Sequence, residues 1–224
     1  MNRHQNYEDR LHSRRRVETA IDRLCERFPL ECRVMALPMG AIKAYRSLID
    51  HWCDARSPTA TKALSRVDRE ALLAIDAVID QSGQLGCYPF SALPTGIQVH
   101  LGESVVHAMC AIDALAVSRV SGQSCRIAAS CALCGKQLTF GTQANGGLCE
   151  EAEHEAAILW ADEVRGHHGT NACCDTLCPG IRFICRSCAE AEGEREEVYT
   201  LAQAAVVANA FFGFQARLRN MEIG

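Results

Sequence analysis

The sequence contains no apolar run close to the roughly 18 residues that a membrane span needs. Its first residues also lack the apolar core that is typical of a signal peptide. Positive charge is not in excess, because 23 Lys and Arg stand against 27 Asp and Glu, a net charge of −4. These absences favour a soluble, cytoplasmic protein and disfavour a nucleic-acid partner or a membrane partner.

The chain has enough apolar material for a core, since 48% of its 224 residues are hydrophobic. This length suits one larger or two small globular domains. Cysteine is the abundant residue type, with fourteen in total, and ten of these lie between Cys110 and Cys188. Without an export signal we expect reduced thiols, so the cysteines indicate metal binding or catalysis rather than a disulfide framework.

The first part of the chain has a helical pattern. Apolar residues recur at helical spacing in three stripes: Val17 to Phe28, Ile42 to Trp52, and Leu72 to Ile79 after a start signal at Ser65–Asp68. A short pair of strands is expected within 88–102, broken by two prolines. Three helices followed by a β-ribbon predict a winged-helix-like domain over residues 1–102.

A winged helix can bind DNA. The third predicted helix, however, carries acidic residues in excess of its arginines, and an acidic face repels phosphate. We therefore expect this region to have a structural or lid role.

The second part, residues 103–224, mixes helices and strands. We expect helices over Val105–Val117, Ala189–Glu197 and Leu201–Leu218, and strands over Cys125–Ala129, Gln137–Thr142 and Ile181–Cys185. This pattern predicts a small, cysteine-rich α/β domain and an α+β fold class for the whole chain.

Cys110 and Asp113 are three residues apart in the first of these helices, so both project from one face. The apolar residues around them would raise the pKa of the carboxyl and favour its proton-donating form. The alternative is a buried cysteine beside a surface aspartate, and the spacing alone does not separate the two interpretations.

Cys173, Cys174 and Cys178 lie in an irregular segment before a strand. Neighbouring thiols in such a segment can bind a soft metal or form a reversible disulfide.

Two CxxC units, Cys131–Cys134 and Cys185–Cys188, stand about fifty residues apart. Four such thiolates can hold one tetrahedral Zn²⁺, and Gly135 suits the tight turn after the first pair. Their separation exceeds the usual one for a zinc site, and a redox-active CxxC pair is the alternative.

Several segments resemble the organomercurial (alkylmercury) lyases. The resemblance extends over roughly residues 15 to 218, and its most specific part is the Met-Cys-Ala-Ile-Asp-Ala-Leu segment ending at Leu115. The segments that carry it are Tyr88–Thr95, His100–Gly102, Val106–Leu115, Ser130–Gly135, the Cys173–Cys174 pair, Leu201–Ala205 and Phe211–Phe214.

This resemblance implies a winged-helix-type domain joined to a small α/β catalytic domain whose active site has two cysteines and one aspartate. By motif match Cys110 is the first cysteine and Asp113 is the acid. The insertion after Cys174 leaves the second cysteine open. Counting forward from Cys110 favours Cys173, and counting back from the following strand favours Cys178. We rank Cys173 first, Cys178 close behind it and Cys174 third.

The resemblance also implies a reaction. Two thiolates and a carboxylic acid cleave a carbon–mercury bond by protonolysis, giving a hydrocarbon and bound Hg(II). Small thiols or a mercuric reductase then accept the Hg(II), in the context of mercuric resistance, and no organic cofactor is needed. The alternatives are a non-enzymatic zinc- or soft-metal-binding protein and a family relative that acts on another substrate.

Overall fold

The computed structural model describes residues 3–54, 59–60, 64–150, 152, 155–161, 172–193, 195 and 197–222. The helices are α1 (Arg3–Arg27), α2 (Leu30–Met35), α3 (Met39–Asp54), α4 (Arg66–Ala74), α5 (Ala111–Ser121), α6 (Cys173–Thr176), α7 (Arg186–Glu192) and α8 (Leu201–Asn220). None of the helices in these ranges is both long enough and apolar enough to cross a membrane.

The strands form two antiparallel sheets. The larger sheet has eight strands in the order β1-β3-β4-β6-β5-β7-β8, with β2 also paired to β3, and the smaller has the order β10-β9-β11. The strands are β1 (Thr59–Ala60), β2 (Val78–Gln81), β3 (Gln84–Cys87), β4 (Phe90–Ser91), β5 (Ile97–Leu101), β6 (Ser104–Ala108), β7 (Cys125–Ser130), β8 (Gln137–Thr142), β9 (Ala156–Trp160), β10 (Ile181–Cys185) and β11 (Val198–Thr200). This mixed architecture confirms the predicted α+β class.

One apolar stripe was wrongly predicted to be a single helix. The helix α4 ends at Ala74, and Val78 already belongs to β2, where it pairs with Cys87 of β3. Between them Asp76 adopts a left-handed φ of 57°, which a continuing helix does not permit. The start signal is confirmed, because the Ser65 hydroxyl accepts a hydrogen bond from the backbone N–H of Asp68.

The helical N-terminal part and the cysteine-rich part share one sheet and one hydrophobic core. Strands β5 and β6, on either side of residue 102, pair with each other, and the predicted partition into 1–102 and 103–224 falls within this hairpin. The strand pair expected within 88–102 is wrong in detail, because β4 and β5 both pair with β6. The winged-helix assignment of the N-terminal part stays a prediction.

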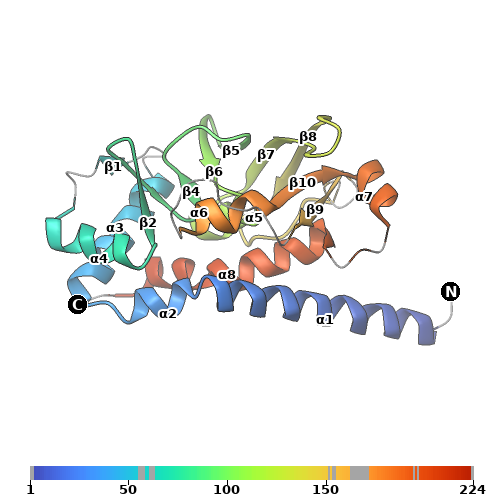
Figure 1. Cartoon of the computed structure of the whole chain (residues 1–224), viewed down its shortest axis with the longest axis horizontal. Coiled ribbons are helices and arrows are strands. Elements are labelled where there is room, and N and C mark those ends of the chain that lie inside the picture. Colours follow the sequence, from blue (N-terminus) through green and yellow to red (C-terminus); the bar gives the residue numbers. More distant parts are fainter. Residues whose placement is uncertain are drawn as a thin grey trace.

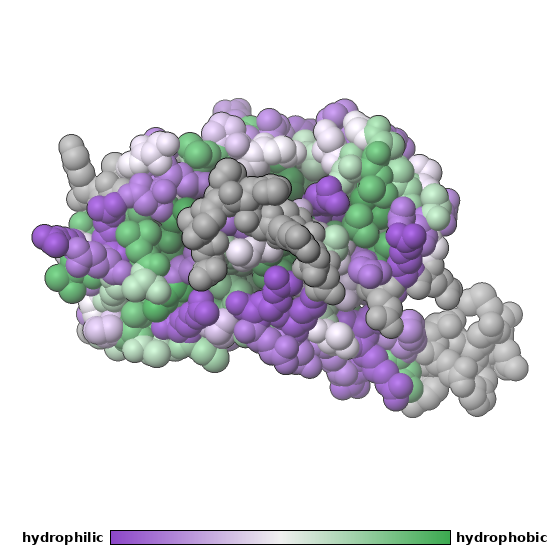
Figure 2. Space-filling model, in the orientation of Figure 1, coloured by the Kyte–Doolittle hydropathy of each residue, from purple (hydrophilic) through white to green (hydrophobic). Residues whose placement is uncertain are grey.

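Helix α5 lies at the centre of the molecule, between the large sheet and α8 (Figure 1). Every residue of α5 except Arg119 is buried. Helices α1 and α8 run side by side along the opposite side of the molecule from the large sheet (Figure 1). The surface along α1 from Arg10 onward is mostly hydrophilic (Figure 2), whereas Ala20 and Leu24 on its inner side are buried. This amphipathic pattern explains why α1 packs on the core.

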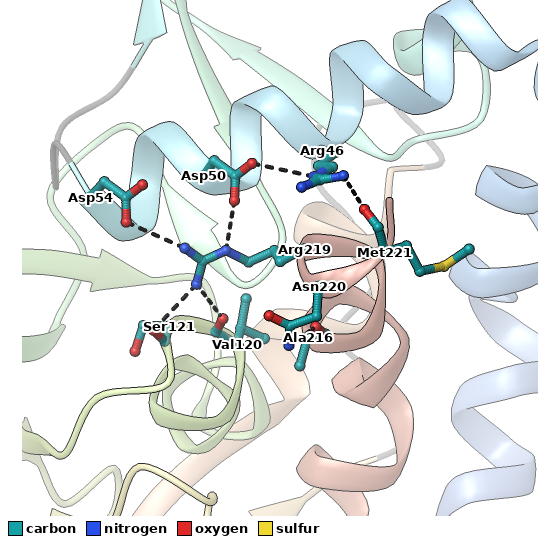
Figure 3. A network of polar contacts seen from close by, with 9 residues as sticks. All are labelled: Arg46, Asp50, Asp54, Val120, Ser121, Ala216, Arg219, Asn220 and Met221. Carbon is teal, nitrogen blue, oxygen red and sulfur yellow. Dashed lines mark hydrogen bonds and ion pairs between the residues drawn. The ribbon is translucent and has the colours of Figure 1, made fainter. Parts of the chain in front are cut away.

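Arg219, in the last turn of α8, joins three helices (Figure 3). Its guanidinium donates to Asp50 Oδ1 of α3 at 2.7 Å and to the carbonyl oxygens of Val120 and Ser121 at 2.8 and 3.2 Å. It also pairs with Asp54 Oδ1 at 3.3 Å. The two carbonyls belong to the last turn of α5, which has no intrahelical donor for them. Arg219 therefore fixes the end of α5 against α3 and α8.

The Arg219→Ala variant should lose about 1–3 kcal/mol of unfolding free energy, because it leaves these carbonyls and Asp50 Oδ1 without their charged donor. Denaturant unfolding measures this loss. The matched control is Arg217→Ala, which removes an exposed pair with Glu31. We expect a loss of about 0.5 kcal/mol or less for this control. Equal losses in the two variants would contradict the role given to Arg219.

Candidate active site

Cys110 stands at the junction between β6 and α5. A helix over Val105–Val117 was expected. This prediction is confirmed from Ala111 onward and wrong before it, because Val105 and Val106 belong to β6 and α5 begins at Ala111. The β-branched valines and the turn at Gly102, with a φ of 59°, favour a hairpin in which β6 pairs with β5. Cys110 is the N-cap residue of α5, and its Sγ accepts a hydrogen bond from the backbone N–H of Asp113 at 3.4 Å.

Asp113 occupies the first turn of α5 and is only 3% exposed. The helix N-terminus favours a charged carboxylate there by about 0.3–1 kcal/mol. Burial opposes it and raises the pKa of the Asp113 carboxyl to about 7, equivalent to about 4 kcal/mol in favour of the neutral form. Desolvation therefore prevails, and Asp113 can hold or release a proton near neutral pH.

Cys178 reaches the same place from a distant segment of the chain. It begins the short 3₁₀ turn Cys178–Gly180 that leads into β10. The Cys178 thiol donates to Asp113 Oδ2 at 3.6 Å. The ligand atoms of Cys110, Asp113 and Cys178 all lie within 4.8 Å of one another, and all three residues are buried.

Both thiols are protonated in this arrangement. Burial raises the pKa of Cys110 to about 12. The pKa of Cys178 is raised well above its usual value by hydrogen bonding with Cys110 and Cys173, and then by burial. A buried carboxyl beside two protonated thiols can exchange protons with them, and thiolates formed in this way are ligands for a soft metal.

Cys173 and Cys174 lie farther out, in the short helix α6. The Sγ atom of Cys173 is 3.9 Å from that of Cys178, but Cys173 lies outside the group of three mutually close residues. Cys174 is half-buried, and burial raises its pKa to about 12. The structure thus brings Cys110, Asp113 and Cys178 together. Cys173 lies outside this group, next to Cys178.

Two residues that the sequence did not indicate hold α6 in place. Asp76 Oδ2 accepts a hydrogen bond from the backbone N–H of Cys173 at 2.6 Å, and the Tyr88 hydroxyl accepts one from the N–H of Cys174 at 2.8 Å. Tyr88 lies in a segment that carries the family resemblance, so this resemblance could have pointed to Tyr88. Asp76 had no such signal, since it was expected within a helix.

A small cavity of about 10 Å³ adjoins the two thiols and the carboxyl. Its walls are mostly apolar and come from several regions of the chain, with Tyr88 and Ile112 among them. Leu24 and Phe28 belong to α1 and the residues that follow it, Leu177 and Ile181 flank Cys178, and Phe211 and Phe212 belong to α8. These walls keep the carboxyl desolvated.

The four CxxC cysteines form a second group, distinct from the first. The sulfur atoms of Cys131, Cys134, Cys185 and Cys188 lie within 4.8 Å of one another.

The fold and the first group of residues define an α+β protein with a buried thiol–carboxylate site suited to a soft metal. A family model described as alkylmercury lyase (MerB) matches residues 90–213, more than half of the chain. The chain therefore belongs to the alkylmercury lyase family, as its sequence predicts.

One solved structure, the mercury-bound form of MerB2, aligns with a TM-score of 0.60 and 19% sequence identity. The alignment covers 83% of this chain and 96% of that chain. At this identity the likeness shows that the two proteins share a fold. A comparison with curated proteins gave no match.

The burial of Asp113 predicts how stability depends on pH. The folded protein keeps the carboxyl proton up to about pH 7, whereas the unfolded chain releases it near the ordinary pKa of 3.8. The folded state therefore binds more protons between these values, and its stability falls as the pH rises. The unfolding free energy of wild type minus that of Asp113→Asn should fall by up to about 1.4 kcal/mol per pH unit across this window.

Denaturant unfolding of both proteins at a series of pH values measures this difference. Because both proteins contain every other titrating group, the difference isolates Asp113. A difference that is flat, or that rises with pH, would show that the carboxyl is ionised in the folded protein.

Proposed function

We propose that this protein is an organomercurial lyase, which cleaves a carbon–mercury bond by protonolysis and releases a hydrocarbon and Hg(II). The observation that carries the proposal is the buried group of two thiols and one carboxyl, in which Cys178 donates to Asp113 and Cys110 lies beside both. Membership of the alkylmercury lyase family supports the same reaction class.

Cys110 and Cys178 bind the mercury of the substrate R–Hg–SR′ in this proposal. Thiolate is the side-chain ligand that soft metals prefer. Cys110 displaces the outgoing thiolate and gives it its own proton, so that R′SH leaves. Mercury binding drives the deprotonation, despite the raised pKa of Cys110, because metal ligation and loss of the thiol proton are coupled.

Asp113 then acts as the proton carrier. Because its pKa is about 7, the carboxyl is ionised in part of the molecules at neutral pH, and this form starts the transfer. Oδ2 of the carboxylate accepts the Cys178 proton across the 3.6 Å contact, and the resulting thiolate becomes the second ligand to mercury. The carboxylic acid next donates this proton to the carbon atom, which takes the electron pair of the C–Hg bond and leaves as R–H. Hg(II) remains bound to two thiolates, so each proton and each electron pair is accounted for.

We assign the second catalytic cysteine to Cys178. The sequence favoured Cys173 by a small margin, but Cys178 has the contact with Asp113 that proton transfer requires. Cys173, 3.9 Å from Cys178, is a third thiol to which Hg(II) can pass on its way out. When Hg(II) moves to Cys173, the Cys173 thiol loses its proton, and the thiolate that Hg(II) leaves takes this proton up.

The apolar cavity walls support protonolysis in two ways. They offer apolar contact to an alkyl or aryl group, for which the cavity must widen, and they exclude the water that would stabilise an ionised Asp113. Leu24 and Phe28 supply part of this wall, so the helical N-terminal part, for which we retain the winged-helix-like assignment, shields the site. The residues described here suffice for this chemistry without an organic cofactor. Small thiols or a mercuric reductase then accept Hg(II) in the cytoplasm as part of mercuric resistance.

A non-enzymatic soft-metal-binding protein is the second candidate, and the additional group of four cysteines favours it. The two candidates differ in the fate of the carbon–mercury bond. A lyase releases hydrocarbon, whereas a binding protein retains the intact organomercurial. A relative that acts on another substrate would neither release hydrocarbon nor need mercury.

Removal of the Asp113 acid should separate binding from cleavage. The Asp113→Asn variant should bind phenylmercury through its thiols but release benzene about 10²–10⁴ times more slowly than wild type, because a general acid contributes a factor of this size. Benzene is measured by gas chromatography in excess thiol, and bound mercury after desalting. The matched control is Asp22→Asn, which alters an exposed carboxylate of α1 and should leave release unchanged. Wild-type release by Asp113→Asn would refute the role of the acid.

Serine variants test the assignment of the second cysteine. Cys178→Ser should slow benzene release by about 10²-fold or more, since it removes both a mercury ligand and the proton donor to Asp113. Cys173→Ser should stay within about 10-fold of wild type in a single turnover. The exposed Cys32 provides a control substitution, Cys32→Ser. The reverse ranking of the two variants, or equal losses, would overturn the choice of Cys178.

A further inference from the structure

The four cysteines of the two CxxC units are unused by the proposed reaction. Their sulfur atoms lie within 4.8 Å of one another, and Cys134 Sγ is 3.6 Å from Cys185 Sγ. A tetrahedral zinc with Zn–S distances of about 2.3 Å places its sulfurs about 3.8 Å apart. A disulfide would instead need about 2.05 Å, and all four cysteines are free thiols. The spacing is therefore that of ligands around one ion.

The local backbone is built to aim these sulfurs inward. The first pair lies in the tight turn between β7 and β8, where the N–H of Gly135 donates to the carbonyl of Cys131 at 2.9 Å. Gly135 has a φ of 76°, which favours glycine. The second pair begins at the end of β10 and continues into the first turn of α7.

Hydrogen bonds also favour sulfur in its thiolate form. The backbone N–H of Cys185 donates to Cys131 Sγ at 3.2 Å, and Ser187 Oγ lies 3.1 Å from Cys185 Sγ. Donors of this kind surround thiolates that ligate metal, because they disperse the negative charge that four thiolates leave on a divalent ion.

We propose that Cys131, Cys134, Cys185 and Cys188 bind one Zn²⁺ as a closed, structural tetrahedral site. The four thiols lose their protons to solvent as the ion binds, and no oxidant is required. With four protein ligands the zinc has no open position for a substrate, so the site serves structure rather than catalysis.

The zinc would join the large sheet to the small one. The turn that carries Cys131 already bonds to β10, because the N–H of Ala132 donates to the carbonyl of Phe183 at 2.9 Å. Strand β10 runs from Ile181, three residues after Cys178, to the zinc ligand Cys185. The ion would thus fix the far end of the strand that positions Cys178. This last consequence rests on the proposed function, whereas zinc binding itself does not.

Metal analysis tests the proposal directly. Protein purified under reducing conditions, without chelator, should contain about one zinc per chain. Replacement of zinc by Co²⁺ should give the intense visible bands of a tetrahedral thiolate site. Zinc well below one per chain that does not rise when Zn²⁺ is added, or a Cys131–Cys134 disulfide under these conditions, would overturn the proposal.

Variants locate the ion. Cys134→Ser and Cys188→Ser should lose zinc, while Cys134→His, which restores a zinc ligand, should retain it if the variant folds. Cys110→Ser and Cys178→Ser should retain zinc, although they lose lyase activity. Loss of zinc from these last two, with retention in the first two, would place the ion in the other thiol group and refute the assignment.

A stability measurement on the wild-type protein tests the proposal even where the cysteine variants fail to fold. Removal of zinc from the wild-type protein by a chelator should lower its Tm by about 5 °C or more, and Zn²⁺ but not Mg²⁺ should restore it. An unchanged Tm after complete zinc removal would contradict a structural role. None of these readouts depends on hydrocarbon release, so failure here is distinguishable from failure of the lyase proposal.

Discussion

The burial of one carboxyl, Asp113, is the constraint around which the structure is organised. An ionised carboxylate without a cationic partner is costly in an apolar interior, and the protein meets this cost by keeping the group near its point of protonation. The polar groups around it include the thiols of Cys110 and Cys178 and the backbone N–H of Cys110. A weakly solvated acid beside soft ligands suits protonation of a carbon bound to a soft metal. In the proposed reaction, the unfavourable burial of the ionised form is thus what drives the Asp113 carboxyl to take up a proton and then pass it to carbon.

This site requires two segments of the chain to be held in fixed positions relative to each other. Cys110 and Asp113 are fixed by the β6–α5 junction, and α5 is enclosed on nearly all sides and tied at its end by Arg219. Cys178 comes from the other segment, which Asp76 and Tyr88 hold at α6. A zinc ion at the far end of β10 would complete the support of this second segment. Rigid placement of donor and acceptor is a large part of what enzymes contribute to proton transfer.

Much of the second half of the fold could be predicted from the sequence. Strands were predicted over Cys125–Ala129, Gln137–Thr142 and Ile181–Cys185, where β7, β8 and β10 lie, and a helix over Leu201–Leu218, where α8 lies. The prediction failed where short apolar runs have no clear period, as in Val105–Ala108, which forms β6, and in Val78–Gln81, which forms β2. In both places pairing with a neighbouring strand decided the conformation, and such pairing is a tertiary effect.

Only part of the candidate site could be predicted from the sequence. Cys110 and Asp113 were identified through a motif, but their geometry differs, because Cys110 caps the helix instead of lying within it. The choice among Cys173, Cys174 and Cys178 could not be made by counting residues. It depends on how α6 and the following turn fold back towards α5, which the spacing does not encode. The four CxxC cysteines lie close together, and zinc binding by them stays a proposal.

In the proposed reaction, this protein moves a proton from its own buried acid to the carbon of an organomercurial. A single turnover of phenylmercury by the purified wild-type protein in D₂O tests it most directly, because thiol and carboxyl protons exchange with solvent. We expect about one benzene per chain, each carrying one deuterium, and one Hg(II) bound to the protein. Stoichiometric binding of intact phenylmercury without benzene would contradict it.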